Sequence, residues 1–126
     1  MQNNEELYSD NILELYRNPL NKREIAGSVL VGKGANPSCG DAIVFYIALD
    51  GEKISDASFT GEGCAISQAA GSMLTEKIKG IMLDKLRMLT PGDIYTMLGI
   101  HISPARVNCA LLAYEAMNRA IKTYDK

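Results

Sequence analysis

The segment that most constrains this chain is Asn-Pro-Ser-Cys-Gly-Asp, at residues 36–41. Its proline and its glycine favour a loop over the interior of a helix or a strand. Cys39 and Asp41 are two residues apart, and in an extended chain side chains at this spacing point to the same side. A thiol and a carboxylate held on one side of a loop make half of a metal site. The remaining ligands of such a site must come from elsewhere in the chain.

The length and composition fit one compact domain covering residues 1–126. With 47% apolar residues the chain can bury a sizeable core, and no internal repeat is visible. Residues 1–20 are expected to form an N-terminal helical segment, since apolar residues recur at helical spacing between 7 and 17. This segment either packs on the body or serves as a mobile docking arm, because chain ends are often poorly anchored.

Charge and hydropathy argue against two classes of partner. The longest apolar run, residues 42–49, is much shorter than the about 20 residues that span a bilayer, so no membrane partner is expected. The net charge is −2 and the basic residues are scattered, which argues against nucleic-acid binding. The polar, acidic N-terminal sequence is unlike a signal or transit peptide, so we expect a cytoplasmic protein. In that reducing compartment the three cysteines are inert core residues or metal and redox groups.

Hydrophobic patterning predicts three short strands, at residues 26–31, 42–49 and 54–60. The Gly-Lys-Gly sequence at 32–34 is expected to end the first strand, and Lys33 and Gly34 are expected to lie in a flexible loop. The second strand is apolar on both faces, which is typical of a central strand. Asp50-Gly51 favours a tight hairpin turn, so the third strand is expected to return antiparallel to the second.

Apolar residues at helical spacing predict about five helices, at residues 7–17, 65–79, 83–89, 91–98 and from 104 onward. Pro19 ends the first of them, and Gly80 and Gly99 end two others. Pro91 and Pro104 suit first helical turns. The expected fold class is α+β, with a small three-stranded antiparallel sheet packed against these helices and a metal site at one end.

Each of the three cysteines lies in a loop or near a helix start. Cys39 is in the loop described above, Cys64 is at the start of one helix, and Cys109 is near the start of another. Loop ends and helix starts gather at one end of an α+β domain, so the three sulfurs can converge there. With Asp41 they would form a four-ligand set suited to zinc or iron. The alternative is three separate buried thiols, since a free cysteine is commonly a core residue.

Three motifs in order resemble one known family. They are the segment at 36–41, Gly-Glu-Gly-Cys-Ala-Ile-Ser at 61–67, and Arg-Val-Asn-Cys at 106–109. Tyr-Arg-Asn-Pro at 16–19 also matches the N-terminal region of that family. Over nearly its whole length the chain resembles the iron–sulfur cluster assembly scaffolds of the IscU, NifU and SufU type. The resemblance implies a three-stranded antiparallel sheet with packed helices, and it favours a shared site over separate buried thiols.

The same resemblance implies that Cys39, Asp41, Cys64 and Cys109 bind the metal or the cluster. Members of the family receive sulfur from a cysteine desulfurase, assemble a [2Fe–2S] cluster and pass it to apo iron–sulfur proteins. Many are isolated with zinc in the same site. As the sulfur acceptor we expect Cys39, because a loop can move toward a persulfide donor, with Cys109 as the second candidate. Asp41 is expected to be the weak ligand, because its oxygen is harder than a thiolate.

The chain departs from the family pattern just before its last cysteine. IscU-type members carry a histidine there, whereas this chain has Asn108, and its Arg106-x-x-Cys109 pattern resembles the SufU branch. SufU-type members, however, carry an insertion that this chain is too short to hold. His101, the only histidine, lies eight residues before Cys109, so the family's histidine role does not transfer to it, and a surface or capping role is expected.

Three functions therefore stay open at this point. They are a cluster scaffold, which is a carrier rather than an enzyme, a SufU-like zinc-dependent sulfur acceptor that counts as a sulfurtransferase, and a structural zinc domain. The apolar content weighs against the third, because a chain with a sizeable core does not need a metal to fold. The oligomeric state also stays open, because the sequence is compatible with both a monomer and a homodimer.

Overall fold

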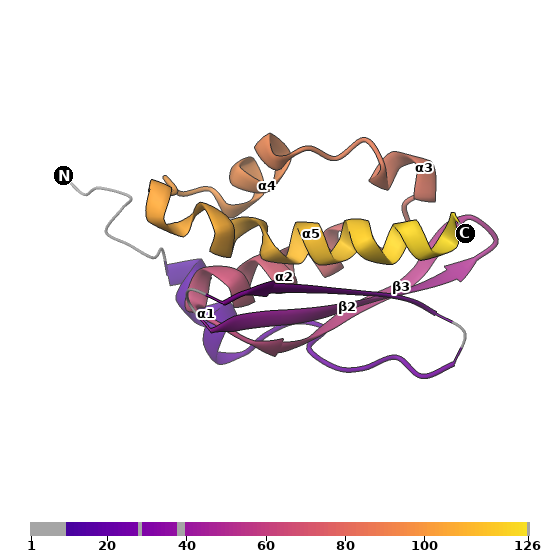
Figure 1. Cartoon of the computed structure of the whole chain (residues 1–126), viewed down its shortest axis with the longest axis horizontal. Coiled ribbons are helices and arrows are strands. Elements are labelled where there is room, and N and C mark those ends of the chain that lie inside the picture. The colour runs from indigo at the N-terminus through magenta and orange to yellow at the C-terminus, as the bar shows by residue number, and fades with distance from the viewer. Residues whose placement is uncertain (1–9, 28, 38–39, 126) are drawn as a thin grey trace.

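The computed structural model of the protein describes residues 10–27, 29–37 and 40–125 (Figure 1). Strands β1 (Leu30–Asn36), β2 (Asp41–Asp50) and β3 (Lys53–Glu62) form one antiparallel sheet in the order β1-β2-β3. The predicted three-stranded sheet, its central strand and the hairpin at Asp50-Gly51 are confirmed, with Gly51 and Glu52 forming the turn.

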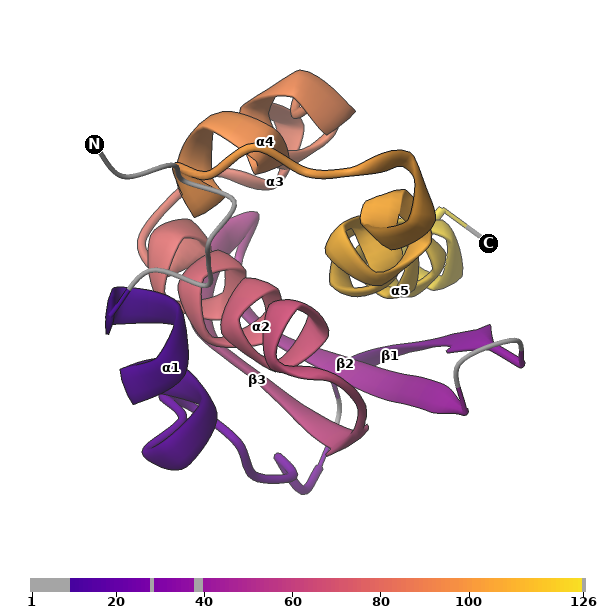
Figure 2. The same cartoon turned by 90° about the vertical axis from the view of Figure 1, so that its left-hand side faces the viewer.

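Helices occupy one side of this sheet. Their bounds are α1 (Asp10–Arg17), α2 (Ala65–Ile78), α3 (Leu83–Leu86), α4 (Pro91–Leu98) and α5 (Val107–Tyr124), and a short 3-10 turn, η1 (Pro104–Arg106), precedes α5. Helices α2 and α5 lie side by side on the sheet, α1 packs against α2, and α3 and α4 form an outer layer (Figures 1 and 2). The α+β class with about five helices is therefore confirmed.

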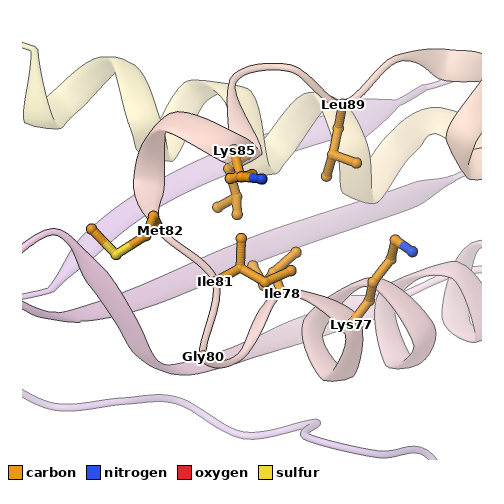
Figure 3. Close-up of a pocket in the computed structure, with 8 residues that line it drawn as sticks. Lys77, Ile78, Gly80, Ile81, Met82, Lys85 and Leu89 are labelled. Carbon is orange, nitrogen blue, oxygen red and sulfur yellow. The ribbon is translucent and has the colours of Figure 1, made fainter.

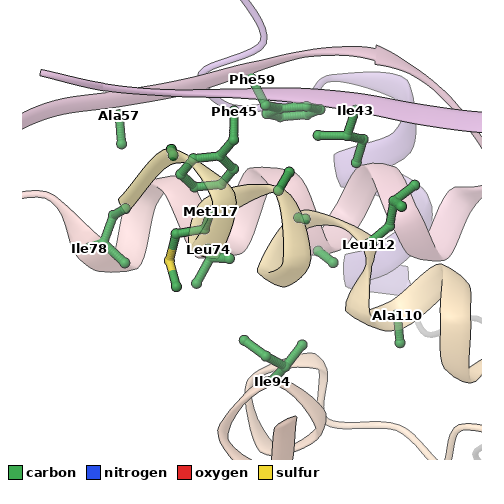
Figure 4. Packing of buried hydrophobic residues seen from close by; sticks show 14 of the residues in the cluster. Ile43, Phe45, Ala57, Phe59, Leu74, Ile78, Ile94, Ala110, Leu112 and Met117 are labelled. Carbon is green, nitrogen blue, oxygen red and sulfur yellow. The ribbon is translucent and has the colours of Figure 1, made fainter. Parts of the chain in front are cut away.

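The core fills the space between the sheet and helices α2 and α5. Inward-facing side chains alternate along β2, where Ile43, Phe45 and Ile47 are fully buried. They pack with Phe59 of β3 against apolar residues of the helices, among them Leu74, Ile78, Leu112 and Met117 (Figure 4). This continuous apolar core places the ends of the sheet and helices in fixed relation to one another.

The first strand differs from its sequence prediction. β1 begins at Leu30 and runs through Gly32 and Gly34 to Asn36, so the first strand exists but lies further along the chain than the predicted 26–31. The predicted break at 32–34 and the flexible loop at Lys33 and Gly34 are wrong. The reason is tertiary: β1 lies directly against α5, and a Cβ atom at Gly32 would overlap the backbone of Ala116 and Ala120. The glycines permit close backbone approach inside a strand instead of ending it.

Helix α1 confirms part of the N-terminal prediction. It ends at Arg17, before Pro19, and buries Ile12 and Leu15 against the body. Residues 1–9 lie outside the described residues, so the docking arm stays a prediction. Among the helices that the structure describes, none is long and apolar enough to cross a bilayer.

A pocket of about 490 Å³ lies at the C-terminal end of α2, beneath α3 (Figure 3). Ile78, Ile81, Leu86 and Leu89 give it apolar walls, and Lys77 and Lys85 also line it. Because α2 is 14 residues long, about 21 Å separates this pocket from the N-terminal end of the same helix. The pocket therefore does not belong to the site described next.

An ion pair between Arg23 and Asp56 links the segment between α1 and β1 to strand β3. Nη2 of Arg23 donates to both carboxylate oxygens of Asp56, at 2.9 and 3.0 Å. This hydrogen bond, together with a backbone bond from Ala57 and the charges of Arg23 and Lys79, lowers the pKa of Asp56 below its ordinary value of 3.8. The side chain of Asp56 is 35% exposed, so solvent screens the pair and its contribution is under about 1 kcal/mol.

We expect Asp56→Asn to lower the free energy of unfolding by less than about 1 kcal/mol at pH 7. Because the folded-state pKa of Asp56 is depressed, this contribution is present above pH 4 to 5 and is lost as the pH falls through that pKa. Urea denaturation of both proteins from pH 7 down to pH 2 measures the difference. A difference that stays constant over this range would contradict the assignment to the ion pair.

Candidate metal centre

Three of the four candidate ligands meet at one end of the molecule. Asp41, Cys64 and Cys109 each offer a ligand atom, and these three atoms all lie within 4.8 Å of one another. They come from the start of β2, the residue before α2 and the first turn of α5. Figure 2 looks onto this end, where β1 ends and where β2, α2 and α5 begin. Cys39, the fourth candidate, lies outside the described residues.

Asp41 is carried to the inner face of the sheet by strand periodicity. It is the first residue of β2 and lies on the same side as the buried Ile43 and Phe45. Its side chain is buried accordingly, with 4% of the residue exposed. A carboxylate would not normally be placed on the apolar face of a sheet, so this position itself indicates a specific partner.

Cys64 is the N-cap residue of α2, which confirms its predicted place at a helix start. Its backbone is extended and its side chain makes no capping hydrogen bond, so the thiol does not cap the helix. Gly63 allows the chain to pass close to Asp41, because a Cβ there would overlap the Ser67 hydroxyl and lie 2.9 Å from Cγ of Asp41. That hydroxyl donates to the carbonyl of Cys64 at 3.0 Å, which fixes the turn between β3 and α2.

Cys109 is the third residue of α5 and is fully buried. The 3-10 turn that opens with Pro104 leads into this helix, close to the predicted helix start. Nδ2 of Asn36 donates a hydrogen bond to Sγ of Cys109 at 3.9 Å. Asn36 is the last residue of β1 and is itself buried, so strand β1 and helix α5 are linked by a polar contact beside the cysteine.

The chemistry of these groups fits a bound cation. Among the described residues, Oδ2 of Asp41 is buried with no hydrogen-bond partner. A buried carboxylate oxygen without a partner is costly, and a metal ion beside it would remove that cost. The two sulfurs are soft ligands that suit zinc or iron. Ligand atoms around a tetrahedral zinc lie about 3.5–3.8 Å apart, so atoms within 4.8 Å of one another need to approach by at most about 1.3 Å.

Other residues singled out in the sequence lie outside this cluster. His101 is exposed and lines a separate pocket of about 320 Å³ with Tyr95, Ile100 and Ile102. It is not among the three described residues whose ligand atoms converge, in agreement with a surface role. Arg106 lies in η1, three residues before Cys109, and is half-buried.

Two residues that support the candidate ligands had no such role predicted from the sequence. The contact of Asn36 with Cys109 and the placement of Ser67 behind Cys64 both depend on the folded chain. For Asn36 a signal was present, because it opens the segment at 36–41 that also holds two candidate ligands. For Ser67 the signal was its place three residues after Cys64, where a helix hydroxyl reaches back to a carbonyl.

The protein therefore has a short antiparallel sheet with two long helices on one face, and a buried carboxylate and two thiols gather at their common end as a candidate metal centre. The matches to known proteins agree. Residues 7–126 match the model of the NifU-like N terminal domain, and the chain belongs to this family of iron–sulfur cluster assembly scaffolds, which includes the IscU and SufU proteins. The family expected from the three motifs is confirmed.

Relatives from both branches are similar to this chain. The zinc-dependent sulfurtransferase SufU of Bacillus subtilis is 36% identical over 132 aligned positions, which cover 91% of this chain and 89% of SufU. The iron–sulfur cluster assembly scaffold protein IscU of Aquifex aeolicus is 36% identical over 119 positions, covering 93% of this chain and 75% of that protein. Because 132 positions exceed the 126 residues of this chain, the SufU relative has residues that this chain lacks.

Solved structures share the fold. A crystal structure of a putative iron–sulfur cluster assembly scaffold protein for the SUF system, from Fervidobacterium islandicum, has a TM-score of 0.73 and 30% sequence identity. The aligned part covers 90% of this chain and 96% of the chain from Fervidobacterium islandicum. A nitrogen-fixing NifU-like protein from Brucella abortus reaches a TM-score of 0.76 at 21% identity, covering 94% of each chain, and this likeness shows the fold alone.

Proposed function

We propose that this protein is the scaffold on which an iron–sulfur cluster is assembled, held by Cys39, Asp41, Cys64 and Cys109, before transfer to an apo-protein. The observation that carries this proposal is the convergence of three ligand atoms from three separate elements within 4.8 Å. The fourth ligand is two residues from Asp41 in the sequence, which keeps it within reach of the same point. The proposed cargo is a [2Fe–2S] cluster.

Sulfur would enter as a persulfide carried by a cysteine desulfurase. A thiolate of this chain attacks the outer sulfur of the donor persulfide, a new S–S bond forms, and the donor cysteine leaves as a thiolate. Cys109 is fully buried, so a donor could not approach it without opening the site. Cys39 is therefore the proposed acceptor, with Cys109 second. Apo iron–sulfur proteins are the proposed recipients of the cluster, and the cytoplasm is the proposed location.

A second function is favoured by one feature of the chain. Asn108 stands where IscU-type members have a histidine, and a SufU sulfurtransferase is among the relatives at 36% identity. In that role the same residues would bind zinc, which keeps coordinating thiols deprotonated. The chain would then accept sulfur from the desulfurase and pass it on without building a cluster.

Purification without oxygen, followed by measurement of metal and acid-labile sulfide, separates the two functions. For the scaffold we expect iron with sulfide, or an apo-protein that gains visible absorption when it is reconstituted with iron and sulfide. For the sulfur acceptor we expect one zinc per chain, no stable cluster, and a persulfide on the protein after incubation with a desulfurase. A protein that binds neither zinc nor a cluster and accepts no sulfur would contradict both.

The role of Asp41 in release gives a further prediction. We expect Asp41→Cys to slow cluster transfer to an apo-ferredoxin by at least about tenfold, or about 1.4 kcal/mol, because a fourth soft ligand replaces a hard oxygen. Transfer is followed by the absorption or circular dichroism of the recipient. Asp50→Cys, at the other end of β2, is a control that should not alter the rate. An unchanged rate for Asp41→Cys would remove this role.

A further inference from the structure

We propose that Asn36 is a positioning residue, which slows the release of a bound metal ion by donating a hydrogen bond to the sulfur of Cys109. The inference rests on the metal centre proposed above and concerns a residue outside its ligand set. It assigns to the first residue of the 36–41 segment a role separate from forming the loop.

Asn36 contacts two of the ligand positions, each in a different way. Its backbone pairs with Asp41 in the antiparallel ladder between β1 and β2. Residues paired in this way have Cα atoms about 4.5–5.5 Å apart. Its side-chain nitrogen lies 3.9 Å from Sγ of Cys109, on α5. Asn36 therefore connects the sheet end that carries Asp41 to the helix that carries Cys109.

Burial makes this contact more effective than its length alone indicates. Asn36 is 8% exposed and Cys109 is fully buried, so little water competes for the sulfur or the amide. Hydrogen bonds in such surroundings are electrostatically stronger than in water. Residues that hydrogen-bond to metal ligands hold them in the binding orientation, and replacing them typically costs 10–100-fold in metal affinity. A ligand that detaches from the metal is then held in place to bind again.

The structure also offers a control for the loss of a buried amide. Gln68 lies on α2 four residues after Cys64 and is 2% exposed. Neither its amide nitrogen nor its amide oxygen has a hydrogen-bond partner within the described part of the chain. Asn36 and Gln68 are thus both buried amides near a candidate ligand, but the hydrogen bond to a ligand sulfur is recorded for Asn36.

Cobalt(II) is the probe, because its sulfur-to-metal charge-transfer band reports on the thiolates. Wild type, Asn36→Leu and Gln68→Leu are each loaded with one cobalt ion, and release to excess EDTA is followed in a stopped-flow instrument. We expect Asn36→Leu to release the ion about 10–100-fold faster than wild type. Its charge-transfer band should shift to lower energy, because the sulfur loses the donor that stabilised its lone pairs. Gln68→Leu should match wild type in both.

The outcomes separate this inference from the function on which it rests. A wild-type protein that binds no cobalt contradicts the metal centre, and the role of Asn36 with it. Binding by wild type with an unchanged rate and band in Asn36→Leu overturns the role of Asn36 alone. Equal acceleration in Gln68→Leu also overturns it, because the effect would then follow from losing any buried amide. If Asn36→Leu does not fold, Asn36→Ser, whose hydroxyl is too short to reach the sulfur, tests the same expectation.

Discussion

A Cys109→Ser variant is expected to bind zinc at least about 100-fold more weakly than wild type while keeping its fold. Structural zinc sites contribute about 10–16 kcal/mol in total, so one of four ligands accounts for roughly 3 kcal/mol, and each 1.4 kcal/mol is tenfold in affinity. Cys109 is fully buried and its sulfur is one of the three ligand atoms that the structure brings together. Serine nearly preserves the shape but replaces the soft sulfur by a hydroxyl.

Competition with a chromophoric chelator measures the affinity, and thermal unfolding monitored by circular dichroism measures the fold. His101→Ala is the matched control, because it removes the only histidine of the chain from an exposed position outside the cluster. We expect this control to bind zinc as wild type does. Wild-type affinity in Cys109→Ser, or a loss in His101→Ala, would show that the zinc binds elsewhere.

The same measurement bears on the structural zinc alternative. The core around Phe45, Phe59 and Leu74 is continuous and lies between the sheet and two long helices. Burial on this scale supports folding without a metal, unlike in small zinc-dependent domains. We therefore expect Cys109→Ser to unfold cooperatively. A metal-free protein that is unfolded would favour the structural role.

Most of the fold could be predicted from the sequence where the signals are local. Helix α4 matches its predicted bounds because Thr90 and Asp93 form a capping box around Pro91, and Gly99 ends the helix in a left-handed conformation. The hairpin between β2 and β3 follows from Asp50-Gly51 in the same way. In such places neighbouring residues determine the backbone, so a single sequence is sufficient.

Prediction was wrong where a distant segment determines the backbone. Gly32 and Gly34 carry the signal of a chain break, yet they lie inside β1 because α5, about 80 residues later, packs against them. The candidate metal centre likewise has features that local sequence determines and features that depend on distant segments. The positions of Asp41 at a strand start and Cys64 at a helix start follow from local sequence. The segment at 36–41 drew attention to Asn36, but its hydrogen bond to Cys109 joins residues 73 apart, so local sequence could not predict that partner.

The packing of β1 on α5 leads to the largest stability effect that we expect. In Gly32→Ala the added methyl group would overlap the backbone oxygen of Ala116 and the backbone nitrogen of Ala120. Backbone atoms of a helix cannot turn aside as a side chain can, so α5 must move away from the sheet. Gly32 does not have a positive φ, so the effect comes from space alone. We expect a loss of about 3 kcal/mol or more in the free energy of unfolding.

Two other glycines provide a graded series for this test. A Cβ at Gly34 would lie 3.1 Å from the backbone oxygen of Leu112, so Gly34→Ala should cost less than Gly32→Ala. A Cβ at Gly92, in the first turn of α4, would meet only ordinary contact at 3.6 Å, and alanine there should be neutral or slightly stabilising. Urea denaturation of the three variants gives the order, and equal stability of Gly32→Ala and Gly92→Ala would contradict the close approach of β1 to α5. Because α5 also carries Cys109, displacement of this helix should weaken zinc binding together with stability.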